Sequence, residues 1–200
     1  MKIGNLIFKD YAKYYDLIYK DKNHLKEISF VSKKLKIDKN SRILDLGCGT
    51  LRHSIYLAGK VKKILGLDLS KTMLKIAENK IEKKGLSPKK IDLNHGNIIN
   101  FKSKEKFNVA YSLFDVICLI TKDSDIKKFF LNLHKHLEPG SLVYLDYWYK
   151  PAVFYMKIKD IRQTYENTHF KIVREKIQKM NKKKNYVNVV FKLKVYNKKN

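Results

Sequence analysis

Apolar positions follow two different periods along the first third of the chain. Between residues 10 and 36 they recur three and four positions apart, with a polar interruption at residues 21–23, and this spacing predicts two amphipathic helices. Residues 42–46 and 61–67 are instead short, mostly apolar runs, which are typical of strands in a covered sheet. The chain is therefore expected to begin with two helices and to continue with two buried strands.

Strands and helices continue to alternate as far as residue 147. Beyond residue 50 the predicted helices cover residues 51–58, 71–84 and 123–137, and the predicted strands cover residues 91–94, 107–113 and 142–147. Strands joined by crossover helices form a parallel sheet with helices on both faces. The predicted fold class is therefore α/β, a Rossmann-like, doubly wound and mostly parallel sheet, and such sheets bind ligands outside the carboxyl ends of their strands.

The tail of the chain has a different pattern. Residues 186–196 alternate between apolar and polar side chains, which predicts a half-buried antiparallel strand, and residues 169–177 are its expected hairpin partner. We therefore expect residues 1–150 to form the core with its N-terminal helices, and residues 151–200 to form a C-terminal helix and an antiparallel hairpin. The hairpin is expected to act either as a lid or as the pair that closes the main sheet.

Basic residues strongly outnumber acidic ones. The 200 residues include 44 Lys and Arg against 19 Asp and Glu, which gives a net charge of +25. Such a charge is typical of nucleic-acid partners, but only four of the basic residues are arginines, whose guanidinium fork favours phosphate and base recognition. A solvated lysine surface is therefore favoured over a nucleic-acid interface, and only weak, salt-sensitive binding to polyanions is expected.

The sequence predicts a cytoplasmic protein without a membrane segment or a metal site. Charged residues interrupt every long apolar stretch, including the N-terminal one, so neither a spanning helix nor an export signal is predicted. Cys48 and Cys118 are far apart and lack the paired spacing of a zinc site or a disulfide framework. The apolar strand in the tail is a plausible edge for a homodimer.

The stretch ILDLGCGTLRHS, residues 43–54, carries the candidate chemistry. Gly47 and Gly49 permit a sharp turn and the close approach of a ligand after the first strand. Asp68 ends the second strand at the position where an acid can bind ribose hydroxyls. Asp45 precedes the turn, and a carboxylate there disfavours a pyrophosphate and suits a cationic part of a ligand. Leu51 stands where a third glycine might be expected, and we expect it to begin the helix.

These residues carry a resemblance to a known family. The segments ILDLGCGT and ILGLDLSKTMLKIAENK resemble the first and second motifs of class I S-adenosylmethionine-dependent methyltransferases, and HGNIINF resembles the third motif. The opening YAKYYDLIY is similar to the N-terminal segment of the small-molecule branch, notably the sugar-amine N-methyltransferases. The likeness covers about residues 10 to 150.

The resemblance implies a function, a cofactor and a set of site residues. The function is transfer of a methyl group from S-adenosylmethionine to a small-molecule acceptor, an amine or a hydroxyl, by direct displacement. Asp115 and Asp146 are the candidates for a catalytic proton acceptor. The implied cofactor-binding residues are Tyr14, Asp45, Gly47, Cys48, Gly49, Asp68, Leu69, Met73, Asn97, Ile98 and Leu113.

Two alternatives remain open on the sequence. The net charge motivates an RNA- or DNA-methylating enzyme, although the segment YSLFDVI lacks the Pro-Pro-aromatic signature used on exocyclic base amines. Leu51 and the short C-terminus motivate a degenerate module that binds the cofactor weakly and serves as a partner subunit.

Overall fold

The computed structural model describes residues 3–156 and 158–198 and divides the chain into two compact units. The first unit contains the chain up to Tyr14 and Asp21–Tyr147, and the second contains Tyr15–Lys20 and Trp148–Asn200. Helix α1 (Ile3–Ile18) contributes to both. No helix of the described residues combines the length and the apolar character needed to cross a membrane.

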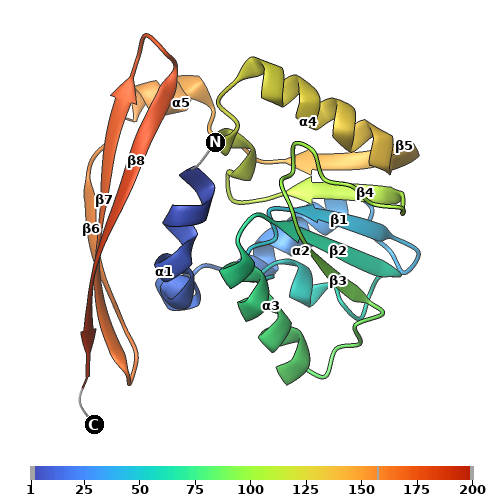
Figure 1. The fold of residues 1–200 in the computed structure, drawn as a ribbon, viewed down its shortest axis with the longest axis horizontal. Coiled ribbons are helices and arrows are strands. Elements are labelled where there is room, and N and C mark those ends of the chain that lie inside the picture. Colours follow the sequence, from blue (N-terminus) through green and yellow to red (C-terminus); the bar gives the residue numbers. More distant parts are fainter. Residues whose placement is uncertain (1–2, 157, 199–200) are drawn as a thin grey trace. The chain divides into compact units, whose positions relative to one another are not determined.

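The first unit is built on a parallel sheet of five strands in the order β3-β2-β1-β4-β5 (Figure 1). The strands are β1 (Arg42–Leu46), β2 (Lys63–Asp68), β3 (Ile91–His95), β4 (Phe107–Ser112) and β5 (Leu137–Leu145). Asp45 pairs with Gly66 of β2 on one side and with Tyr111 of β4 on the other. The α/β, mostly parallel fold predicted from the sequence is confirmed, and the carboxyl ends of the strands lie along one edge of this sheet.

Helices cover both faces of the sheet, as predicted (Figure 1). One face packs against α2 (His24–Lys34) and α3 (Lys71–Lys83), in a buried cluster that includes Ile28 and Leu74. The other face packs against α4 (Asp123–His136) through Phe129 and Leu133. The side chain of Ser70 caps α3 by accepting a hydrogen bond from the Met73 amide, which fixes where this helix begins after β2.

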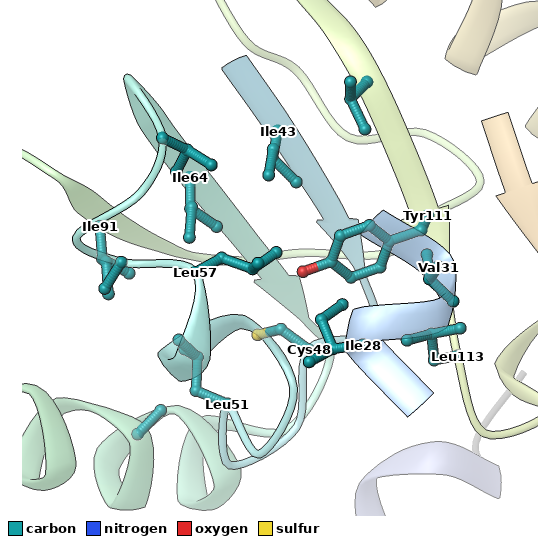
Figure 2. Packing of buried hydrophobic residues seen from close by; sticks show 14 of the residues in the cluster. Ile28, Val31, Ile43, Cys48, Leu51, Leu57, Ile64, Ile91, Tyr111 and Leu113 are labelled. Carbon is teal, nitrogen blue, oxygen red and sulfur yellow. The ribbon is translucent and has the colours of Figure 1, made fainter. Parts of the chain in front are cut away.

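The helix predicted at residues 51–58 is wrong. Leu51 has φ of +63°, in the left-handed region that an α-helix cannot contain, and only a short 3-10 helix, η1 (Ser54–Tyr56), follows it. The Leu51 side chain is fully buried in the core beside Cys48 and Leu57 (Figure 2). Burial of a large apolar side chain thus holds the backbone in a conformation that glycine would adopt more readily.

The fifth strand begins earlier than predicted. Helix α4 ends at His136, and β5 runs from Leu137 through Pro139 and Gly140, where the register with β4 shifts. Because β5 is the last strand in the sheet order, a proline there need not interrupt a ladder on its open side. Gly140 has φ of +78°, so the Pro-Gly pair is a bend within the strand and not the boundary that ends the helix.

The second unit contains a separate antiparallel sheet in the order β6-β7-β8 and a short helix, α5 (Lys150–Tyr155). The strands are β6 (Ile161–Glu166), β7 (Phe170–Asn181) and β8 (Tyr186–Asn197). The predicted hairpin is confirmed as β7 and β8, but it does not pair with the parallel sheet, so the alternative that it closes that sheet is wrong. Strand β6 was not predicted, because its six residues are mostly polar and exposed.

A buried arginine organises the interior of the second unit. The guanidinium of Arg174 lies 5.4 Å from the ring centroid of Tyr19, 5.1 Å from that of Tyr165 and 5.6 Å from that of Phe191. It donates hydrogen bonds to the Tyr19 hydroxyl at 3.1 Å and to Gln163 Oε1 at 2.8 Å. Arg174 therefore joins all three strands to the Tyr15–Lys20 segment through cation–π contacts and hydrogen bonds.

Candidate cofactor site

The turn after β1 is fixed by its backbone. The amides of Gly47 and Cys48 both donate to the carbonyl oxygen of Leu67, at 2.7 and 3.0 Å, which ties the turn to β2. Gly47 has φ of +82°, and a Cβ there would lie 2.6 Å from Cγ1 of Val116. Gly49 has φ of +53°, but a Cβ there would meet nothing within 4 Å. Packing therefore requires Gly47 to be glycine, whereas Gly49 borders the open space that a ligand needs for close approach.

Asp68 joins this turn to α3. Its Oδ2 accepts a hydrogen bond from the Gly49 amide at 2.8 Å, and its Oδ1 accepts one from the Ser70 amide at 2.8 Å. Burial raises the pKa of Asp68, and these backbone bonds oppose the shift. Each carboxylate oxygen can accept a second hydrogen bond, so Asp68 can hold the turn and still bind hydroxyl groups of a ligand.

Asp45 has a different environment. It is 4% exposed, and among the described residues only the Ser54 hydroxyl donates to it, through Oδ2. The Ser54 hydroxyl also hydrogen-bonds the hydroxyl of Tyr111, which is fully buried on the neighbouring strand. Burial raises the pKa of Asp45 to about 7, the charge of Asp68 adds to this shift, and the Ser54 bond opposes it. Oδ1 of Asp45 is left for a ligand.

The two acids have no lysine or arginine partner within the part of the chain that the structure describes. Among the described residues, neither Asp45 nor Asp68 forms an ion pair with a lysine or an arginine, although the chain has 44 of them. Buried carboxylates without a counter-charge are costly, since burial disfavours the ionised form. The arrangement is therefore suited to a ligand that supplies positive charge.

A second turn lies at the end of β4, where Phe114 and Asp115 both have left-handed backbones, with φ of +72° and +61°. The carboxylate of Asp146 accepts hydrogen bonds from both of their amides, at 2.6 Å from Phe114 and 2.8 Å from Asp115. The turn leads into η2 (Val116–Leu119), which places Val116 against Gly47. Asp146 thus holds a turn, and a catalytic role for Asp115 or Asp146 stays a prediction.

A cluster of charged and aromatic groups adjoins the second turn. Nε2 of His53 lies 2.9 Å from Oε2 of Glu27, and Lys22 pairs with the other oxygen of Glu27. The Lys22 ammonium lies 4.7 Å from the ring centroid of Phe114. Burial lowers the pKa of His53, while Glu27 opposes the shift. His53 therefore links the N-terminus of α2 to the loop after the glycine turn.

The other predicted cofactor residues mostly follow the same edge of the sheet. Leu69 and Met73 follow β2, Asn97 and Ile98 follow β3, and Leu113 follows β4. Burial raises the pKa of the Cys48 thiol, which keeps it protonated and unsuited to nucleophilic attack.

Two of the predicted residues have more specific surroundings. The side-chain oxygen of Asn97 accepts a hydrogen bond from the backbone amide of Ile99 at 3.0 Å. The side-chain amino group of Asn97 can therefore donate to another group. Tyr14 lies half-buried on α1. The described residues contain no cluster of three His, Cys, Asp or Glu side chains placed to hold a metal ion.

Sequence reasoning missed Ser54 and Tyr111, the two hydroxyl groups behind Asp45. Neither belongs to a motif, and they are 57 positions apart. Only the pairing of β1 with β4 places Tyr111 beside Asp45. To predict these two residues from the sequence, the order of the strands in the sheet would have had to be known, and the sequence pattern does not give that order.

Comparison with known proteins agrees with this geometry. Residues 43–140, which include the glycine turn, both acids and β1 to β4, match a family model described as a methyltransferase domain. By this match, residues 43–140 form a methyltransferase domain. Two sequence relatives are methyltransferases of known kind. A dTDP-3-amino-3,4,6-trideoxy-alpha-D-glucopyranose N,N-dimethyltransferase of Streptomyces venezuelae is 26% identical over 72% of this chain and 60% of its own length. A demethylmenaquinone methyltransferase of Geobacillus stearothermophilus is 27% identical over 74% of this chain and 64% of its own length.

Solved structures share the fold of this methyltransferase domain. The crystal structure of Streptomyces venezuelae DesVI aligns with a TM-score of 0.72 at 20% identity, covering 93% of this chain and 83% of that one. The structure of S-adenosylmethionine-bound CalS10, an amino pentose methyltransferase from Micromonospora echinaspora, aligns with a TM-score of 0.69 at 18% identity, covering 96% and 83%. At these identities the likeness establishes the fold. The chain spans less than two thirds of the length of the sequence relatives described above.

Proposed function

We propose that this methyltransferase domain binds S-adenosylmethionine at the glycine turn and transfers its methyl group to a small-molecule acceptor, with an amine on a sugar as the favoured class. The observation that carries the proposal is the pair of acids, Asp45 and Asp68, which flank an open glycine turn without a lysine or arginine partner among the described residues. The chain has a net charge of +25, yet no lysine or arginine of the described residues forms an ion pair with either carboxylate.

The residues present fit the proposed cofactor. S-adenosylmethionine carries an ammonium and a sulfonium group, and when bound it supplies an electrophilic methyl group. Oδ1 of Asp45 offers a buried acceptor for the ammonium, and Asp68 retains acceptor capacity for ribose hydroxyls. The space beside Gly49 admits a ligand close to the backbone. Asn97 and the Ile98 amide, which follow β3, are proposed to bind the adenine.

The chain's own contribution to catalysis is positioning and exclusion of water. Direct displacement requires the acceptor's lone pair to face the methyl group in line, and orientation of this kind can supply most of the barrier lowering. The turn at Phe114 and Asp115 is held by Asp146 and packs on Gly47 through Val116, so it gives the acceptor side of the site a fixed wall. An acceptor amine must arrive neutral, and Asp115 and Asp146 remain the proposed groups for its proton.

The acceptor class is supported by the relatives. Two amino-sugar N,N-dimethyltransferases, of Streptomyces venezuelae and Streptomyces fradiae, each match 72% of this chain at 26% identity. We further propose that residues 151–200, with the C-terminal helix and hairpin, act as a lid. We also propose that the protein forms a homodimer and is located in the cytoplasm. The exposed thiol of Cys118 supports a reducing compartment.

The proposal is tested by calorimetric titration of the full chain with S-adenosylmethionine and with S-adenosylhomocysteine. We expect dissociation constants in the micromolar range for both. Absence of binding in a sample that circular dichroism shows to be folded would overturn the proposal. Where binding is found, mass spectrometry of nucleotide-linked amino sugars incubated with the chain and cofactor should show methylation of the amine, and matched sugars with a hydroxyl in its place should stay unmodified.

A further inference from the structure

A chain of three buried side chains lies behind the glycine turn. The hydroxyl of Tyr111 on β4 contacts the hydroxyl of Ser54 in η1, and Ser54 donates to the carboxylate of Asp45 on β1. We propose that cofactor binding releases a proton from Asp45, and that Ser54 and Tyr111 set the pH range in which this happens. The inference rests on the proposed function and extends it to the proton balance of binding.

The geometry allows Asp45 to exist in either protonation state. A hydroxyl group both donates and accepts, whereas an ionised carboxylate only accepts. When Asp45 is ionised, Tyr111 donates to Ser54 and Ser54 donates to Asp45. When Asp45 is protonated, the proton can lie on Oδ1, while Oδ2 still accepts from Ser54 and Ser54 still accepts from Tyr111. Both hydrogen bonds of the chain keep their direction and each hydroxyl proton keeps its acceptor, so the structure tolerates both states.

The surroundings of Asp45 favour the protonated state when no cation is bound. Asp68, the last residue of β2, adds negative charge. The Cys48 thiol in the turn and the Tyr111 hydroxyl are neutral, because burial raises the pKa of each. His53, which is next to Ser54 in the sequence, interacts with Glu27 and Lys22 instead. Burial of Asp45 and the charge of Asp68 raise its pKa to about 7. At neutral pH the free protein therefore contains a mixture of ionised and protonated Asp45.

A bound cation changes this balance. An ammonium group beside Oδ1 stabilises the ionised carboxylate, so binding lowers the pKa of Asp45, and one proton passes from the carboxyl to the buffer. The affinity should then rise with pH while Asp45 is mostly protonated in the free protein. We expect an increase of about tenfold between pH 5 and pH 6 and about fivefold between pH 6 and pH 7. This range lies below the pKa of the cofactor's own amino group, so that group stays charged throughout.

The experiment is calorimetric titration of the full chain with S-adenosylhomocysteine, which keeps the ammonium but lacks the sulfonium charge. Repeating the titration at one pH in buffers with different ionisation enthalpies gives the number of protons released. We expect about half a proton per site at pH 7 and nearly one at pH 6. Binding without net proton release at either pH would overturn the inference while leaving the proposed function intact. Absence of binding at every pH would overturn both.

Variants assign the proton to Asp45. Ser54→Ala removes the only described donor to this carboxylate and should move the rise in affinity to higher pH, whereas Tyr111→Phe should move it less. Ser112→Ala is the matched control, because Ser112 is also a fully buried serine but donates to the Leu46 carbonyl at 2.8 Å. Equal midpoints for Ser54→Ala and Ser112→Ala would overturn the role of Ser54.

A measurement on the unmodified protein keeps the inference testable if a variant fails to fold. Carbon-detected NMR of the free chain, labelled at aspartate carboxyls, should show Asp45 titrating near pH 7. When S-adenosylhomocysteine is bound, the Asp45 carboxyl should stay ionised across this pH range, so its resonance should not shift. A free-protein midpoint below about pH 5 would contradict the inference, since Asp45 would then have no proton to release at neutral pH.

Discussion

Two turns at the carboxyl edge of the parallel sheet both contain left-handed backbone conformations, but different residues adopt them. The turn after β1 places glycines at its left-handed positions, Gly47 and Gly49. The turn after β4 places Phe114 and Asp115 there, and the carboxylate of Asp146 holds both of their amides. The first turn is therefore permitted by the absence of side chains, whereas the second is held by a hydrogen-bonded acid.

The aspartates at the two turns differ in what remains for a ligand. Both oxygens of Asp146 already accept backbone amides. Asp45 accepts a single described hydrogen bond, from Ser54, through one of its two oxygens. Asp45 thus keeps one oxygen without a described donor, whereas both oxygens of Asp146 have one. This distinction separates Asp45 from Asp146 although their positions in the sequence pattern are alike.

The largest expected effect is that of Gly47→Ala. A Cβ at Gly47 would lie 2.6 Å from Val116 and would also sit on a left-handed backbone, so we expect a loss of about 2 to 5 kcal/mol in the free energy of unfolding. Gly49→Ala is the control, because its Cβ meets nothing within 4 Å, and it should cost only about 1 to 2 kcal/mol. Urea unfolding measures both, and equal losses would contradict the packing role of Gly47.

Substitutions at Leu51 come next. Leu51→Gly removes a fully buried side chain but relieves a left-handed backbone, and we expect a net loss of about 2 to 3 kcal/mol in the free energy of unfolding. Leu51→Ala removes most of the same side chain and keeps the backbone strain, so it should be less stable than the glycine variant by about 1 kcal/mol. Calorimetry should show cofactor affinity within about twofold in both variants, because the side chain packs into the core. A tenfold change in affinity would show that Leu51 acts on the site.

Asp146→Asn should have an intermediate effect. Asparagine offers one acceptor oxygen in place of two, so one of the amides of Phe114 and Asp115 loses its partner, at a cost of about 1 to 3 kcal/mol in unfolding free energy. Asp115→Asn is the control, because asparagine tolerates a left-handed backbone and this change leaves both amide bonds in place. Thermal unfolding compares the stability of the two variants. A greater loss of stability for Asp115→Asn would contradict the role of Asp146 in holding the two amides.

At pH 5, Asp45→Asn should have the smallest effect on stability, and one of opposite sign. Because the folded-state pKa of about 7 lies above the ordinary value of 3.8, the unmodified protein is most stable below about pH 4 with respect to this group and loses stability as the pH rises from about 4 to about 7. The variant lacks this loss, so its stability relative to the unmodified protein should rise by about 3 kcal/mol between pH 5 and pH 8. Urea unfolding at pH 5 and pH 8 measures the difference. Equal pH dependence in the two proteins would argue against a raised pKa.

The main sheet and the acids of the first turn could be predicted from the sequence because both depend on local patterns. Apolar runs mark β1 and β2, and Asp45 and Asp68 follow from their place at strand ends beside glycines. The helix after the turn was mispredicted at Leu51, since the periodicity of apolar residues does not report a left-handed backbone. Local pattern thus identifies the elements but not the conformation of a single connecting residue.

The groups that depend on contacts between distant strands could not be predicted. Tyr111 reaches Ser54 only because β4 pairs with β1, and Asp146 reaches the Phe114 amide across the ends of β4 and β5. Strand β6 was missed for another reason, because it carries few apolar residues and pairs through its backbone with β7. Each of these features depends on strand order or on backbone pairing, and the local pattern of apolar and polar residues predicts neither.

The separation of two buried acids from a lysine-rich chain also has a kinetic consequence. A net charge of +25 produces a positive field around the protein, which opposes the approach of a cationic cofactor and would attract the proposed acceptor if that acceptor is an anionic, nucleotide-linked sugar. Salt screens this field over about 8 Å at physiological ionic strength. Added salt should therefore speed the association of S-adenosylmethionine and slow that of such an acceptor. The ratio of the two association rates should thus depend on the ionic strength of the medium.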